Sequence, residues 1–167
     1  PIYFASLGVG FIAIETAIIQ QTRLFLGHPT PATTTVLATL LIGGGLGSGL
    51  VGRLDVRDGS SIPVWPALGI AFLVLLWIPA WAWLSQRFLS AGPRLRTLVV
   101  VTSLSPLALF MGMPFPLGLR AVGRGGDRHV ALSWAVNGVM SVAGSVCAVT
   151  LAVVAGFSRV LLLGTLS

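Results

Sequence analysis

Glu15 is the residue of this chain whose type and setting could support proton or cation chemistry. It lies in the stretch GVGFIAIETAIIQQ, residues 8–21, where the other polar side chains are Thr16 and two glutamines. A carboxylate in such a run can take up a proton, bind a cation or accept hydrogen bonds from a neighbouring helix. Asn137 and Ser141, four residues apart in another apolar run, are among the donors that a neighbouring helix could offer. These three residues form the candidate polar site.

Glu15 has three interpretations at this stage. The carboxyl group is protonated, it accepts a hydrogen bond from a donor such as Asn137, or its partner lies outside this chain. Gly8, Glu15 and Thr22 are spaced by seven residues, so they share one helix face, roughly 10 Å of helix separating Glu15 from Thr22. A polar clamp between helices and a proton- or cation-handling group in a transport path both fit this placement, and a polyamine would be a natural ligand for the second.

The sequence offers no other set of residues suited to catalysis. It contains no HExxH motif, no Ser/His pair and no paired acids inside its apolar runs. Its single cysteine, Cys147, and its two histidines are too far apart to predict a metal site. His28, which precedes Pro29, fits either a turn or a proton shuttle. We therefore predict no catalytic residue, no metal and no cofactor.

The composition places these residues in a membrane protein. Of the 167 residues, 55% are hydrophobic and 8% are charged, and the mean hydropathy is +0.97. A soluble domain carries roughly 25% charged residues, so this chain could not cover itself with a polar surface in water. The net charge of +6 comes from ten arginines dispersed among short connections. This dispersion is typical of membrane loops and argues against nucleic acid as a partner.

Five apolar runs are long enough to cross a bilayer as helices, for which about 20 residues each are needed. The alternating pattern of a membrane barrel does not occur. We therefore predict one all-α transmembrane domain with spans at about 2–21, 31–52, 62–84, 98–119 and 130–156, and a truncated sixth span from 160. Because the chain opens on Pro1 and ends within an apolar run, we expect it to be part of a longer protein.

The charges at the span ends leave the orientation open. Arginine favours the cytoplasmic side of a membrane, but five arginines fall on each side. One side has Arg53, Arg57, Arg120, Arg124 and Arg128, and the other has Arg23, Arg87, Arg94, Arg96 and Arg159. The tryptophans of the third span, Trp65, Trp77, Trp81 and Trp83, predict aromatic belts at the two interfaces.

Small residues spaced by four predict two close contacts between helices. The second span contains Gly43 and Gly47, and also Gly45 and Gly49; the fifth contains Gly144, Ala148, Ala152 and Gly156. Since four residues make about one helical turn, each set gives a smooth stripe on which another backbone can lie. A phosphate-binding glycine loop is not supported, because no lysine and no preceding strand accompany these glycines.

The fourth span is expected to be interrupted. Pro106 lies inside it, and Pro114 and Pro116 follow within the motif MGMPFPLG, residues 111–118. Proline removes a backbone donor and clashes with the preceding helical turn. The resulting break could line a binding site, as broken helices do in transporters, or it could only shape the packing.

Several of these motifs together resemble the membrane part of bacterial spermidine-synthase-like multi-pass proteins. The matching stretches are FASLGVGFIAIE at 4–15, IQ at 19–20, LFLGHP at 24–29, GLGS at 45–48, GR at 52–53, MGMPFPLGLR at 111–120, WAVNG at 134–138, SVAGS at 141–145 and GF at 156–157. The resemblance covers nearly the whole chain.

The resemblance implies a module that is typically joined to a soluble synthase domain, and in some members to a facilitator-like half. It also implies that the second and fourth connections are cytoplasmic. The nucleotide-binding domain is absent from this sequence, so aminopropyl transfer is not predicted. We predict a noncatalytic, multi-pass domain of the bacterial inner membrane. It would act as a helix-packing or anchoring module that contacts lipid and further transmembrane helices or subunits. The alternative is half of a transporter for a cationic small molecule such as a polyamine, with Glu15 in the path.

Overall fold

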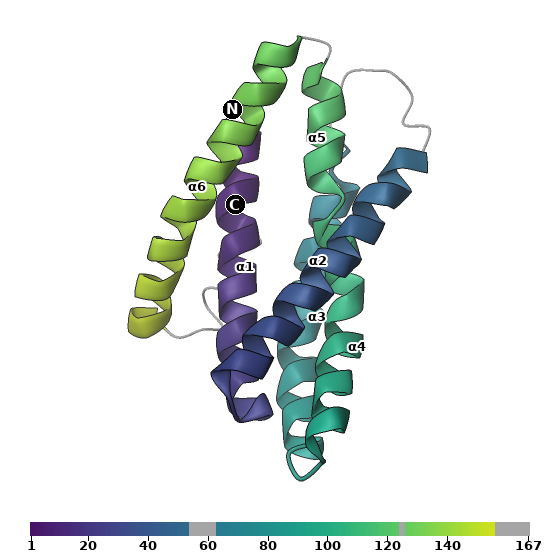
Figure 1. The fold of residues 1–167 in the computed structure, drawn as a ribbon, viewed down its shortest axis with the longest axis vertical. Coiled ribbons are helices and arrows are strands. Elements are labelled where there is room, and N and C mark those ends of the chain that lie inside the picture. Colours follow the sequence, from purple (N-terminus) through teal and green to yellow (C-terminus); the bar gives the residue numbers. More distant parts are fainter. Residues whose placement is uncertain (54–62, 124–125, 156–167) are drawn as a thin grey trace.

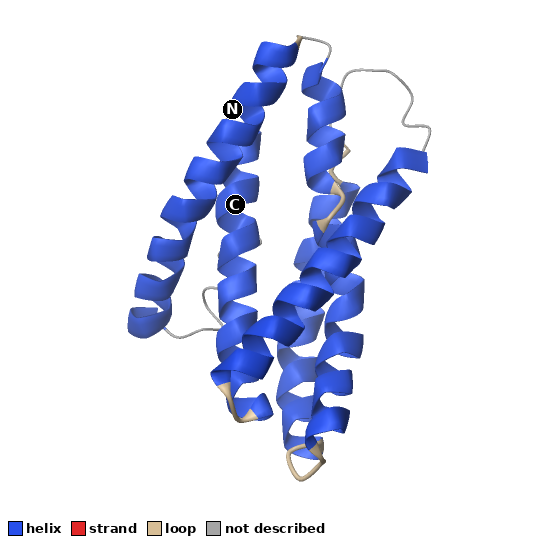
Figure 2. Cartoon of the chain, in the orientation of Figure 1, coloured by secondary structure: helices blue, strands red, loops and turns tan. Residues whose placement is uncertain are grey.

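The computed structural model describes residues 1–53, 63–123 and 126–155 of the chain. Within these ranges the backbone forms six helices, and no strand occurs (Figure 2). The helices are α1 (Ile2–Leu26), α2 (Pro29–Arg53), α3 (Trp65–Arg87), α4 (Pro93–Met111), α5 (Pro114–Gly123) and α6 (Asp127–Ala155). The all-α fold predicted from the sequence is confirmed. The predicted sixth span lies outside the described residues.

The helices alternate in direction along the long axis of the bundle (Figure 1). α1, α3 and α6 run one way, whereas α2 and the pair α4–α5 run the other way. Five segments of the described chain are long and apolar enough to cross a membrane, with α4 and α5 together forming one of them, Pro93–Gly123. The chain is therefore a multi-pass, membrane-embedded helical protein.

α1 is longer than the span predicted at 2–21, because its polar end continues the helix. The Thr22 hydroxyl donates to the carbonyl oxygen of Ile18 at 2.8 Å, and Arg23 donates to the Gln20 side chain at 3.0 Å. The helix ends only at Gly27, whose φ of 82° reverses the chain and whose N–H donates to the Arg23 carbonyl oxygen. Such a left-handed cap favours glycine, which has no Cβ to clash.

The break in the fourth span is not at Pro106, so that part of the prediction is wrong. α4 continues through Pro106 to Met111, and the interruption falls at 112–113, directly before α5 begins at Pro114. An internal proline costs a helix one backbone donor, and the rest of its bonds persist in an apolar setting. Pro114 and Pro116 lie in the first turn of α5, where backbone N–H groups have no helical acceptor to lose.

The core lies between α1, α2, α3 and α4. Its central members are large apolar side chains from all four helices: Ile14, Ile18, Phe25, Val36, Leu40, Val74, Trp77, Trp81, Val100, Leu104 and Leu107. Trp77 and Trp81 are each 5% exposed and stack with their ring centroids 5.0 Å apart. They are core residues, so their assignment to an interfacial belt is wrong, whereas Trp83 is 65% exposed.

Candidate functional site

Polar side chains of the described helices donate hydrogen bonds to the backbone of another helix. The Tyr3 hydroxyl donates to the Pro114 carbonyl oxygen (2.7 Å), the Asn137 amide to that of Phe4 (3.2 Å), the Ser141 hydroxyl to that of Gly8 (3.4 Å), and the Arg96 guanidinium to that of Phe25 (3.1 Å). In every case the acceptor is a carbonyl oxygen of a helix, so these side chains connect helices to each other.

Asn137 and Ser141 connect α6 to α1, which run in parallel side by side (Figure 1). Their acceptors on α1 are four residues apart, as they are on α6, so the two helices keep one register. Gly8 allows this approach, because a Cβ placed on it would lie 2.5 Å from the Asn137 carbonyl oxygen. The single hydroxyl hydrogen of Ser141 is shared with the Asn137 carbonyl oxygen of its own helix, 2.8 Å away. This part of the predicted polar site is a helix contact.

Glu15 is not in that contact. It is half-buried near the middle of α1, about 16 Å along the helix from Leu26 and about 20 Å from Ile2. The expected hydrogen bond from Asn137 does not form, because Asn137 donates to Phe4, eleven residues earlier on α1. Among the described residues Glu15 has no hydrogen bond or ion pair. A protonated carboxyl group and a partner outside the described residues are the two interpretations left.

The register of α6 explains why α6 supplies no donor to Glu15. Gly144 lies against Val9 and Ile12 of α1, since a Cβ built on it would meet both. One turn further along, position 148 reaches the level of Glu15, and this position is an alanine. The side chains at 148 and 152 and the whole of Gly156 lie outside the described residues, so the lower part of the predicted α6 stripe stays a prediction.

The helix break lies far from Glu15. Tyr3 bonds to Pro114 at the start of α5, and at 1.5 Å per residue Glu15 is about 18 Å further along α1. Aromatic rings fill the space beside the break: Phe115 contacts Phe4 with ring centroids 5.6 Å apart and Trp134 with centroids 4.6 Å apart. The structure therefore does not bring Glu15 and the broken span together in one site.

The glycines of α2 divide into two sets. Gly43 and Gly47 are buried where α2 crosses α4, and a Cβ on either would collide with Ala108 or Leu109. Gly112, at the break, packs in the same way against the Gly44 backbone. A Cβ on Gly45 or Gly49 would meet no atom of the described chain within 4 Å. The first set is thus a contact inside the bundle, while the second lies on its outer surface.

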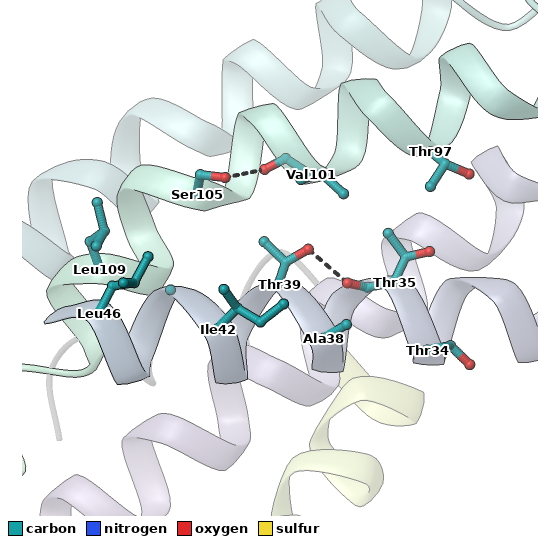
Figure 3. A pocket seen from close by; sticks show the side chains of 11 residues that line it. Thr34, Thr35, Ala38, Thr39, Ile42, Leu46, Thr97, Val101, Ser105 and Leu109 are labelled. Atoms are coloured by element: carbon teal, nitrogen blue, oxygen red, sulfur yellow. Dashed lines mark hydrogen bonds between the residues drawn. The ribbon is translucent and has the colours of Figure 1, made fainter. Parts of the chain in front are cut away.

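A groove of about 420 Å³ lies between α2 and α4 (Figure 3). Its lining includes five hydroxyl side chains, and four of these donate to their own helix: Thr34 to Thr30, Thr39 to Thr35, Thr97 to Pro93 and Ser105 to Val101. Two of these bonds are drawn in Figure 3. Glu15 is not among the lining residues. Such a groove suits an apolar occupant better than a polar one.

Arg96 has a role that the sequence analysis does not predict. It is half-buried and bonds to α1, although the sequence places it among the loop charges. The periodicity of α4 could have revealed this role: if α4 begins at Pro93, Arg96 shares a face with Val100 and Leu104.

His28 is exposed in the turn between α1 and α2. The His, Cys, Asp and Glu residues of the described ranges form no group that could hold a metal ion.

Comparison of the chain with protein families, with curated proteins and with solved structures finds no match.

Proposed function

We propose that this chain is a noncatalytic membrane module that packs against, and anchors, further transmembrane helices of a larger bacterial inner-membrane protein or complex. The observation that carries the proposal is that polar side chains of this chain donate hydrogen bonds from one helix to another. Tyr3, Arg96, Asn137 and Ser141 each donate to a carbonyl oxygen of a neighbouring helix. Hydrogen bonds of this kind hold helices together in lipid, where water cannot replace them.

The outer surface of α2 supports a partner helix beyond the bundle. Gly45 and Gly49 are four residues apart and face open space. Glycine disfavours a helix by about 1 kcal/mol relative to alanine. On a surface that contacts only lipid, no close helix contact would offset this cost. Closely packed transmembrane helices, in contrast, use such small residues at their contacts. The resemblance to spermidine-synthase-like membrane proteins supports the same proposal, because that module is joined to further domains.

The test is the size of the assembly that copurifies with the tagged chain from solubilised membranes of its own cells. We expect a species larger than the monomer, and we expect Gly45→Leu with Gly49→Leu to reduce it to the monomer. Gly138→Leu on α6 is the matched control, because a Cβ on Gly138 also meets no described atom within 4 Å. A wild-type chain that leaves its native membrane as a monomer would contradict the proposal.

Glu15 favours a second candidate function, half of a transporter for a cationic small molecule such as a polyamine. A carboxylate at membrane depth is costly unless it is paired or neutral, and Glu15 has no partner among the described residues. The test is uptake of labelled spermidine into vesicles that contain the protein. Transport predicts uptake that Glu15→Gln abolishes and Asp127→Asn, at an exposed carboxylate, leaves unchanged. Absence of uptake by the wild-type chain would rule this function out.

A further inference from the structure

One end of the molecule carries arginines with no acid beside them. It includes the C-terminal ends of α1 and α3 and the N-terminal ends of α2 and α4 (Figure 1). Arg23, Arg87, Arg94 and Arg96 lie there. The two acids of the described ranges are elsewhere, Glu15 in the middle of α1 and Asp127 at the opposite end of the bundle. This end therefore attracts anions, although the sequence places five arginines on each side of the membrane.

Arg87 and Arg94 are the exposed members of this set, and they flank the loop 88–92 between α3 and α4. The loop is held by Arg96. Its Nε donates to the Ala91 carbonyl oxygen at 2.9 Å, and its Nη2 donates to that of Leu89. These bonds to backbone acceptors fix Arg96 and order the loop. Arg87 and Arg94 have no hydrogen bond or ion pair with the described residues, so their guanidinium groups can bind an external partner.

Exposed apolar side chains lie close to these two arginines in the sequence, on the same helix ends and loop. Trp83 is 65% exposed, Leu89 is 55% exposed and Leu95 is 45% exposed. Tryptophan at the end of a membrane helix lies at the level of the lipid headgroups, and leucine next to it contacts acyl chains. The combination of guanidinium groups with apolar side chains matches a phospholipid, which presents a phosphate directly above hydrocarbon.

We propose that Arg87 and Arg94 bind the phosphate of an anionic phospholipid at this end of the bundle. A guanidinium group offers a planar pair of donors that fits two phosphate oxygens. An anionic lipid surface attracts each arginine that lies near it. The inference does not depend on the proposed module function, because it concerns lipid contacted by the chain itself.

The experiment measures lipid retained by the purified chain in a neutral detergent, by native mass spectrometry, with phosphatidylglycerol or phosphatidylcholine added. We expect the wild-type chain to retain phosphatidylglycerol preferentially. Arg87→Gln with Arg94→Gln should weaken this retention about thirtyfold, which corresponds to about 2 kcal/mol for two arginines. Arg87→Lys with Arg94→Lys keeps the charge and should weaken it less.

The matched control is Arg53→Gln with Arg128→Gln, which removes two exposed arginines from the opposite end. This pair should retain phosphatidylglycerol as the wild-type chain does. Equal losses in the two double variants, or equal retention of the two lipids by the wild-type chain, would overturn the proposal. A third arm adds inorganic phosphate, which should not displace the lipid. Displacement by millimolar phosphate would show a general anion site and would also overturn it.

Discussion

Arg96 contacts Phe25 in two ways. Its Nη1 donates to the Phe25 carbonyl oxygen at 3.1 Å, and its guanidinium carbon lies 5.8 Å from the centroid of the Phe25 ring. The Phe25 carbonyl lies in the last turn of α1, where it has no helical N–H group to accept from, and a cation at a helix C-terminus is favourable. This pair therefore joins the end of α1 to the first turns of α4.

Replacing Arg96 with lysine should destabilise the bundle by about 2 to 3 kcal/mol. Lysine keeps the charge but cannot reach three backbone carbonyls with a planar set of donors, and a hydrogen bond to a charged group is worth about 1.5 to 3 kcal/mol. Thermal unfolding in a neutral detergent measures the loss. Arg94→Lys, at the exposed arginine two residues earlier, should stay within about 0.5 kcal/mol of the wild-type protein. Equal effects of the two changes would show that the Arg96 contacts contribute nothing.

The glycines of α2 allow the same substitution to be tested on the two sides of one helix. Gly47→Ala should destabilise the chain by about 1 to 3 kcal/mol, because its methyl group would overlap the Leu109 backbone and push α2 away from α4. Gly45→Ala should be neutral or stabilising, because the position is open and alanine is the better helix former. Unfolding of the isolated chain in detergent distinguishes them. A loss at Gly45 equal to that at Gly47 would contradict the crossing seen here.

Asn137→Leu should loosen α6 from α1. Hydrogen bonds between membrane helices average about 0.6 kcal/mol and reach about 1.7 kcal/mol, so the global stability should fall by about 1 kcal/mol. Amide hydrogen exchange should rise in α6 and in the first turns of α1, and not in α2 or α4. Ser145→Ala is the control, since Ser145 is bonded only within α6, to the Val142 carbonyl oxygen at 2.7 Å. Unchanged exchange in Asn137→Leu would refute a clamping role.

The five membrane-spanning segments of the described residues and their helical type could be predicted from the sequence because lipid admits few structures. Long apolar runs must satisfy their backbone groups internally, so they form helices whatever surrounds them. The small-residue spacing of α2 was also informative, because the spacing of residues along a helix fixes which of them share a face. The spacing did not show which face of α2 contacts another helix of the bundle. Gly43 and Gly45 could therefore not be distinguished without the position of α4.

The polar contacts could not be predicted, because they depend on the offset between helices. A shift of α6 by about three turns would put Asn137 beside Glu15, as the sequence allowed, whereas the observed register puts it beside Phe4. The break in the fourth span shows a similar limit. Pro106 and Pro114 have the same chemistry, but Pro114 lies at the start of a helical turn, and Pro106 lies within a helix that continues past it.

The stacked pair Trp77 and Trp81 provides a further prediction, because the two side chains are equally buried but only the indole N–H of Trp77 is a fully buried donor without an acceptor among the described residues. The Trp77 indole N–H is buried and has no acceptor among the described residues. A buried donor without a partner costs about 1 to 3 kcal/mol. Phenylalanine at this position loses ring area but also removes the unpaired donor, so the two effects offset each other.

Trp81→Phe has no such compensation, and it weakens the edge contact with Phe25, whose ring centroid is 5.2 Å away. We therefore expect Trp81→Phe to cost at least about 1 kcal/mol more than Trp77→Phe in thermal unfolding. The same volume is removed in both variants, so packing loss alone predicts equal effects. A greater cost at Trp77 would mean that its N–H binds an acceptor in the membrane, and it would identify that acceptor as a contributor to the stability of the core.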